Sequence, residues 1–210
     1  MNKDRSGGCT SLPGARDREH RDRTRRHTGL TRGTAVTLAG VLIETDRLLL
    51  RPLTVADLDE IDALNAMPDV VRTMGSMDRL TAGARLELGE QEWRDRGYGL
   101  MAVIERATGR FLGRSGLKYW PQFGETEVGW VLRSDVWGHG FATEAGRACI
   151  EWGLGSLGLP YLTAMIRPDN DRSIRVAERL GMRRLRPDVL VDIPVVVYVI
   201  GRRASVPQTG

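Results

Sequence analysis

The fold of this 210-residue chain is decided by the stretch Trp130-Val-Leu-Arg-Ser-Asp-Val-Trp137-Gly-His-Gly-Phe-Ala-Thr-Glu-Ala145. It begins as a strand, turns through Gly138 and Gly140, and continues as a helix. Glycine allows a tight turn and leaves no side chain between the backbone N–H groups and a ligand. The helix start adds unpaired N–H groups and the positive end of a dipole. The stretch therefore predicts an anion site, most naturally for a phosphate or pyrophosphate.

The residues around the turn exclude two common classes of phosphate-binding site. A nucleoside-triphosphate loop needs Gly-Lys-Ser/Thr, whereas Gly140 is followed by Phe141 and Ala142. A dinucleotide fingerprint needs a third glycine, but position 143 is threonine. The turn also follows a β-meander rather than opening a βαβ unit, so another phosphate ligand is indicated.

The composition is that of an ordinary globular domain, with 41% hydrophobic and 28% charged residues. No apolar run is long enough to cross a membrane. Residues 1–33 carry nine basic and four acidic residues, so the net charge of +4 leaves −1 for the rest of the chain. The near-neutral body argues against a nucleic-acid partner. Two cysteines, Cys9 and Cys149, form neither a disulfide framework nor a metal cluster, and a cytoplasmic location is expected.

The chain divides into three parts by composition. Residues 1–40 are charged and poor in apolar residues, which predicts a disordered basic tail. A folded domain is expected over 41–204 and a disordered end over 205–210. In the domain, helices are expected from Thr54 and Thr81, and Met67 to Met77 as an irregular connection. Strands are expected over 45–51, 98–105, 110–120, 125–133, 161–166, 183–189 and 191–202, with helices after Gly140 and Ser173.

Three separated motifs carry a family resemblance. Glu127-Val-Gly-Trp-Val-Leu-Arg followed by Trp137-Gly-His-Gly-Phe-Ala-Thr-Glu-Ala resembles the coenzyme A motif of the GNAT N-acetyltransferase superfamily. Arg167-Pro-x-Asn170-x-x-Ser173 with Glu-x-Leu-Gly181-Met182 continues it, and Thr45-x-Arg47-Leu-x-Leu-Arg51-Pro resembles the opening of the branch that acetylates ribosomal-protein N-termini.

The resemblance implies an α/β (α+β) fold: a mixed, mostly antiparallel sheet with helices on both faces. The strand ending at Arg133 would splay from the strand starting near Tyr161, and acetyl-CoA would lie in that gap. Its pantetheine would pair with the backbone near Trp130 to Leu132, its pyrophosphate with amides from His139 to Thr143, and Asn170 would hold the pantetheine arm. The implied cofactor-binding residues are Trp130, Val131, Leu132, Trp137, Gly138, His139, Gly140, Phe141, Ala142, Thr143, Asn170 and Ser173. No metal is expected.

Two side chains are candidates for the chemistry of acyl transfer to an amine. Glu127 is the candidate general base, against the alternative of a solvated edge-strand carboxylate. Ser173 is the candidate thiolate stabiliser, against the alternative of a helix-capping residue. The family's usual tyrosine acid does not carry over, because Ala177 stands at its position. The family's usual oxyanion donor corresponds to the N–H of Val131.

The acceptor amine stays open between a protein N-terminus, a polyamine, an aminoglycoside and an amino-acid derivative. A homodimer also stays open. The alternative functions are an acyl-CoA-binding sensor without turnover and a nucleic-acid binder that uses the basic tail. Cys149 falls on the apolar stripe of its helix, which favours core packing over a nucleophile.

Overall fold

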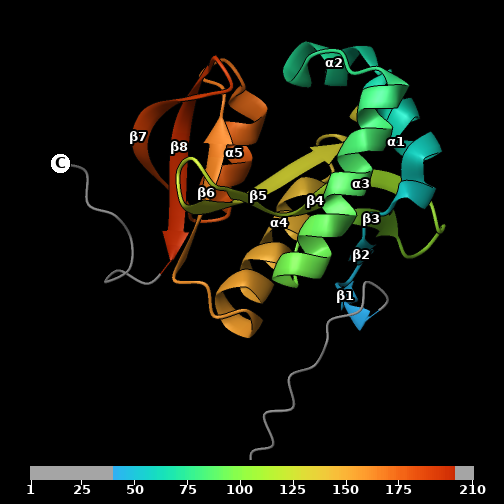
Figure 1. Ribbon diagram of the computed structural model, residues 1–210, viewed down its shortest axis with the longest axis horizontal. Coiled ribbons are helices and arrows are strands. Elements are labelled where there is room, and N and C mark those ends of the chain that lie inside the picture. Colours follow the sequence, from blue (N-terminus) through green and yellow to red (C-terminus); the bar gives the residue numbers. More distant parts are fainter. Residues whose placement is uncertain (1–39, 202–210) are drawn as a thin grey trace, which may run out of the picture. The chain divides into compact units, whose positions relative to one another are not determined.

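The computed structural model describes residues 40–201, so the expected tails at 1–39 and 202–210 lie outside the described residues. The helices are α1 (Leu58–Asn65), α2 (Pro68–Met74), α3 (Arg79–Arg96), α4 (Phe141–Glu151) and α5 (Asp171–Arg179). The strands are β1 (Ile43–Glu44), β2 (Leu48–Pro52), β3 (Leu100–Glu105), β4 (Phe111–Trp120), β5 (Glu125–Leu132), β6 (Tyr161–Ile166), β7 (Arg183–Leu190) and β8 (Ile193–Gly201). Short turns of other helix types lie at Val55–Asp57, Ser134–Val136 and Trp152–Ser156 (Figure 1).

The strands form one sheet in the order β1-β2-β3-β4-β5-β6-β8-β7. All neighbours are antiparallel except β5 and β6, which run parallel. Strands β4 and β5 pair along their length, from Gly113↔Leu132 to Trp120↔Glu125. In contrast, β5 and β6 pair at Glu127↔Thr163 alone and then separate. The predicted mixed sheet with a splayed strand pair is confirmed.

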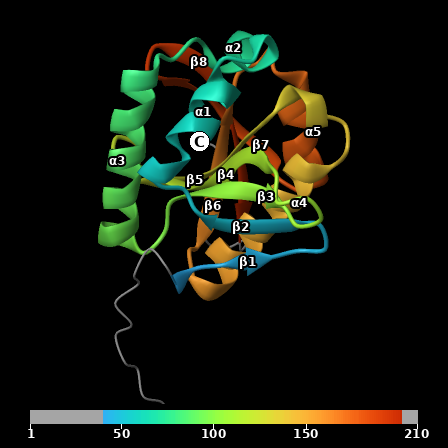
Figure 2. The same ribbon diagram turned by 90° about the vertical axis from the view of Figure 1, so that its right-hand side faces the viewer.

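Helices cover both faces of this sheet (Figure 2). On one face, Ala145 and Cys149 of α4 and Ala177 of α5 are buried against strand residues such as Leu117 and Val128. On the other face, Ile61 and Leu64 of α1 and Leu86 of α3 pack with Ala102 of β3. Side chains along a strand point alternately to the two faces of a sheet, so Ser115 of β4, Trp130 of β5 and every second residue from them face α4. Val131 and every second residue from it face α1 and α3.

The boundaries differ from the expected ones at several places. The connection expected to be irregular contains helix α2, with Pro68 in its first turn. Helix α3 begins at Arg79, because the carboxylate of Asp78, rather than Thr81, caps it by accepting from the Thr81 N–H at 2.7 Å. The strand expected over 45–51 is β2, which begins later, at Leu48, and includes Pro52, and the short strand β1 precedes it. The described residues contain no helix long and apolar enough to cross a membrane.

Candidate active site

The glycine turn before α4 leaves its N–H groups open to a ligand. Gly138 and Gly140 have φ angles of +85° and +83°, which residues with a Cβ rarely adopt. The first helical hydrogen bond of α4 runs from the Glu144 N–H to the Gly140 carbonyl at 3.0 Å. No side chain caps the helix. The N–H groups of Phe141 to Thr143 can therefore bind an anion, as a pyrophosphate site requires.

Arg47 braces this turn from the segment between β1 and β2. Its Nη1 donates to the His139 carbonyl at 3.0 Å, and its Nε donates to the Glu144 carboxylate at 2.7 Å. Its guanidinium lies 4.3 Å from the centre of the Phe141 ring. Thr45 Oγ1 donates to the same carboxylate at 2.6 Å. Arg47 lies in the motif that opens the domain, and its contacts with the glycine turn were not predicted.

The separation of β5 from β6 leaves backbone groups of β5 facing the gap. The Arg133 N–H donates to Leu112 at 2.8 Å, on the β4 side. N–H directions alternate along a strand, so Val131 also points toward β4, whereas Trp130 and Leu132 point into the gap. Trp137 Nε1 donates to the Leu132 carbonyl at 2.8 Å, which agrees with this alternation. The N–H groups available to a ligand in the gap are therefore those of Trp130 and Leu132, whereas the Val131 N–H, the expected oxyanion donor, is directed toward β4.

The gap and the turn open into one cavity of about 420 Å³. Every residue expected to bind the cofactor lines it except His139. His139 is exposed, with Nδ1 at 3.1 Å from the Trp137 carbonyl. The lining comprises Thr73, Met74, Trp130, Val131, Leu132, Val136, Trp137, Gly138, Gly140, Phe141, Ala142, Thr143, Asn170, Arg172, Ser173, Arg175, Val176 and Arg179.

The chain matches a known protein family. The family model described as an acetyltransferase (GNAT) domain matches residues 47–183. The chain belongs to the GNAT acetyltransferase family. Members of this family transfer acetyl groups from acetyl-CoA.

Two curated proteins from bacilli are similar to this chain in sequence. The chain is 36% identical over 110 residues to the uncharacterized protein YkkB of Bacillus subtilis (strain 168), a match that covers 50% of this chain and 63% of that protein. It is 28% identical over 150 residues to the uncharacterized N-acetyltransferase p20 of Bacillus licheniformis, covering 67% of this chain and 81% of that protein.

Solved structures show the same fold. An acetyltransferase from Agrobacterium tumefaciens str. C58 is 31% identical with a TM-score of 0.68, and the match covers 77% of this chain and 95% of that one. The ribosomal-protein-S5-alanine acetyltransferase from Vibrio fischeri is 16% identical with a TM-score of 0.65, and covers 80% of this chain and 100% of that one. At that identity the second likeness concerns the fold alone.

Glu127 holds a defined place in this GNAT fold, at the point where β5 and β6 part. Its Oε1 accepts the Met165 N–H at 3.1 Å, and its Oε2 accepts the Trp120 indole N–H at 2.6 Å. Met165 lies two residues beyond Thr163, so its N–H is the next one of β6 on the β5 side, and the Glu127 carboxylate replaces the missing strand partner. The alternative of a solvated carboxylate is therefore wrong.

Burial raises the pKa of Glu127 above its ordinary value. The hydrogen bonds from Trp120 and Met165 oppose this rise, as do the charges of Lys118 and Arg114. A carboxylate with a raised pKa accepts a proton more readily near neutral pH. Glu127 does not line the cavity described above; it projects from the sheet face on the α1 and α3 side.

The start of α5 presents Asn170 and Ser173 to the cavity in different roles. The Asn170 side chain caps the helix, because its Oδ1 accepts the Ser173 N–H at 3.1 Å. The Ser173 hydroxyl makes no hydrogen bond to a described residue, so the alternative of Ser173 as the cap is wrong. Arg172, for which the sequence predicted no role, lies 4.5 Å from the centre of the Trp137 ring. Arg175 and Arg179 also line the cavity and add positive charge to it.

Cys149 is fully buried in α4 beside Ser115, and burial raises the pKa of its thiol to about 12. Such a thiol remains protonated near neutral pH and is no nucleophile. The described residues hold no group of three side chains suited to binding a metal ion.

Proposed function

We propose that this protein is an N-acetyltransferase that moves an acetyl group from acetyl-CoA to a primary amine, either a protein N-terminus or a small molecule. The observation that carries the proposal is the meeting of the β5–β6 gap and the uncapped start of α4 at one cavity. A strand edge suits the amide-bearing pantetheine arm, and the helix start suits the pyrophosphate.

The donor side of the reaction requires stabilisation of the developing oxyanion. The N–H groups of Trp130 and Leu132 are fixed by the pairing of β5 with β4 and face the gap. Fixed backbone donors aimed at such an oxygen are an effective source of catalysis. The Ser173 hydroxyl has a free proton to donate, which fits the role of stabilising the departing thiolate. Asn170 would contribute its amide N–H groups to the pantetheine arm.

The acceptor side requires a neutral amine. At pH 7, deprotonation costs about 1 kcal/mol for an α-amine and about 4.6 kcal/mol for a lysine-type amine. The amine nitrogen forms a bond to the acetyl carbon, its proton passes to Glu127 directly or through water, and the carbon–sulfur bond then breaks to release the thiolate. The two fixed hydrogen bonds of Glu127 leave other lone pairs of the carboxylate for that proton.

Direct transfer in a ternary complex is favoured over a covalent acetyl-enzyme. Among the described residues Cys149 is the one cysteine, and its buried, protonated thiol cannot attack a thioester. We therefore expect both substrates to be bound before the first product leaves.

A thiol-release assay tests the proposal. Purified protein is incubated with acetyl-CoA and a panel of primary amines, and the products are identified by mass spectrometry. Release of coenzyme A together with an acetylated amine supports the proposal. Tight binding of acetyl-CoA in calorimetry without any acetylated product contradicts it and favours a sensor.

A further inference from the structure

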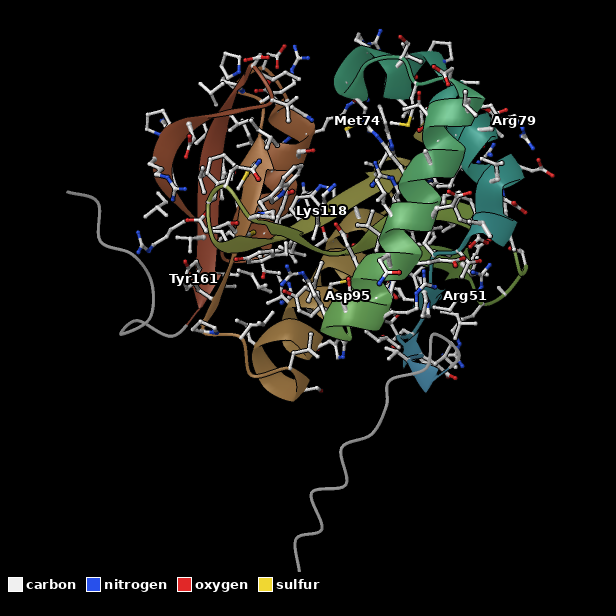
Figure 3. The ribbon with its side chains drawn as sticks, viewed as in Figure 1. Arg51, Met74, Arg79, Asp95, Lys118 and Tyr161 are labelled. Carbon is white, nitrogen blue, oxygen red and sulfur yellow. The ribbon has the colours of Figure 1, made fainter. Side chains whose placement is uncertain are left out.

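A polar strip formed by Arg114, Lys118 and Glu127 around Gly129 lies on β4 and β5, on the face toward α1 and α3. A Cβ at Gly129 would meet no atom within 4 Å, so the space above this glycine is open. The opposite residue, Gly116, is buried, and a Cβ there would lie 2.5 Å from the Gly99 carbonyl oxygen. The pair Arg114↔Val131 bounds one end and the pair Lys118↔Glu127 bounds the other. Figure 3 shows Lys118 on the sheet between α5 and α3, and Met74 on the neighbouring helix α2.

The strip carries an excess of positive charge. Neither Arg114, Lys118 nor Arg85 of α3 forms an ion pair with any residue in 40–201. Of the nearby acids, Glu125 forms an ion pair elsewhere, whereas Glu127 bonds to neutral groups and its charge still acts on Arg114 and Lys118. Glu125 receives two hydrogen bonds from Arg186, at 3.0 and 3.1 Å, and Glu127 receives those from Trp120 and Met165. Lys118 stacks on the Trp120 ring at 4.4 Å, which orients its ammonium without neutralising it.

Arg114 is the most unusual of the three cations. It is half-buried, and burial together with the charge of Arg85 lowers the pKa of its guanidinium, while the charge of Glu127 opposes this shift. It makes no hydrogen bond to the described residues, and these leave no fully buried side-chain nitrogen without a partner. Its guanidinium therefore faces accessible space. A half-buried arginine beside a second cation is costly, and the charge of Glu127, which forms no ion pair with it, offsets that cost only in part. An anion bound at Arg114 would offset the remainder.

We propose that this strip binds the anionic group of the acceptor, so that the substrate is a small amine that also carries a carboxylate. The guanidinium of Arg114, helped by Arg85, holds the carboxylate, as its planar fork suits. The amine then points past Gly129 toward Glu127. Arg114 and Lys118 are four positions apart on β4, about 13 Å, and the long side chains at both ends shorten the span to that of a small amino acid.

The same charges favour the chemistry of the proposed transfer. A cationic environment disfavours the protonated form of a bound amine, so Lys118 and Arg114 assist its deprotonation. They also repel acceptors with several positive charges. Polyamines and aminoglycosides are thereby disfavoured among the acceptors that the sequence left open, and amino-acid derivatives are favoured.

This inference rests on the proposed acetyl transfer and is tested separately from it by binding. Protein saturated with coenzyme A is titrated calorimetrically with β-alanine and γ-aminobutyrate, with the amides of both, and with putrescine. We expect the carboxylates to bind about 10- to 100-fold more tightly than their amides, the range of one charged hydrogen-bonded pair. Amides or putrescine that bind as tightly as the carboxylates, or carboxylates that do not bind at all, would overturn the inference.

Variants of Arg114 and Arg85 test whether these two residues cause the preference for carboxylates over amides. R114Q should abolish the preference for carboxylates over amides, and R114K, which keeps the charge, should retain part of it. R85Q changes an exposed side chain and should weaken the preference without affecting folding. The matched control is R94Q on the same helix, which removes contacts to Glu90 and Gln91 and should change nothing. An unaltered preference in both R114Q and R85Q would overturn the inference.

A further titration tests whether the bound carboxylate belongs to a free amino acid or to the acidic first residue of a protein. Tripeptides with a first-residue Asp or Glu and an amidated C-terminus are compared with their Asn and Gln counterparts. Binding of the free amino acids alone supports the proposal. Binding of the acidic peptides alone overturns it in favour of a protein N-terminus. Failure of acetyl-CoA to bind, or acetylation of no amine at all, refutes the proposed function instead.

Discussion

Replacing Glu127 with Gln probes the proposed base with little change in shape. The Gln side chain keeps an oxygen that can accept the Met165 N–H, which now bonds at 3.1 Å, and it loses the acceptor of the Trp120 indole N–H. A net loss of about 1 kcal/mol for that hydrogen bond is offset by removal of a buried charge. E127Q should therefore unfold within a few degrees of the wild-type protein.

The expected effect on catalysis is much larger. A positioned general base contributes about 10²- to 10⁴-fold, or about 2.7 to 5.4 kcal/mol of transition-state stabilisation. We expect kcat/KM to fall by a factor in that range, with a greater loss for lysine-type amines than for α-amines.

The pH dependence of kcat/KM distinguishes a general base from a residue that only links β5 to β6 by a hydrogen bond. Since burial raises the pKa of Glu127, wild-type activity should fall as the pH drops through a pKa above the ordinary value for a glutamate. E127Q should lack this fall in activity, so that its kcat/KM follows the titration of the amine alone. E87Q, an exposed change on α3, is the control and should follow the wild-type profile. A wild-type profile in E127Q would remove Glu127 from proton transfer.

The linked effect on stability has the opposite sign from that of a salt-bridged carboxylate. A folded-state pKa above the unfolded value means that the folded protein binds the proton more tightly. The contribution of Glu127 to stability is therefore present at low pH and declines as the pH rises through the raised pKa. E127Q should show a smaller decline in melting temperature across this window.

Three further predictions concern the turn, α5 and the Arg51–Asp57 pair. G140A forces a side chain into a φ of +83°, at about 1–2 kcal/mol, and should weaken acetyl-CoA binding about tenfold in calorimetry; G155A, whose Cβ meets open space, should bind normally. S173A should keep acetyl-CoA affinity and lower kcat several-fold in the thiol-release assay; full turnover would exclude Ser173 from the chemistry. Although burial opposes ionisation, hydrogen bonds from Arg51 and Thr54 hold the pKa of Asp57 below its usual value, so its stabilisation is lost as the pH falls through that pKa. D57N should lower the free energy of unfolding by about 1–3 kcal/mol at pH 7 and flatten its acid dependence in denaturant titrations; a wild-type acid dependence would contradict the assignment.

The parts of the fold that could be predicted from the sequence depend on local signals. The turn before α4 needs left-handed glycines, and Gly138 and Gly140 supply them whatever surrounds them. The spacing of Phe141, Ala145 and Cys149 determines the buried face of α4 in the same local way.

Helix α2 was missed because its boundary signals were interpreted as loop signals. Pro68 lies in the first turn, where its missing N–H costs nothing, and Gly75 ends the helix with a φ of +81°. These are the residues that also mark irregular connections. Thr73 and Met74, at the end of this helix, line the cavity.

The roles of Glu127 and Arg114 depend on contacts between distant segments. Met165 lies 38 residues beyond Glu127, and its N–H needs the carboxylate because β5 and β6 have separated at that point. Arg114 is unusual because it lies near Arg85 and forms no ion pair with a described acid, which a sequence cannot show. The direction of the Val131 N–H likewise follows from the register of β4 and β5, which becomes visible in the folded sheet.

We propose direct transfer of an acetyl group from acetyl-CoA to an amine while both are bound to the protein. Initial rates of thiol release, measured while the concentrations of acetyl-CoA and of an accepted amine are both varied, test this mechanism. We predict double-reciprocal lines that intersect, as a ternary complex requires. Parallel lines, or an acetylated protein isolated before the amine is added, would contradict the account.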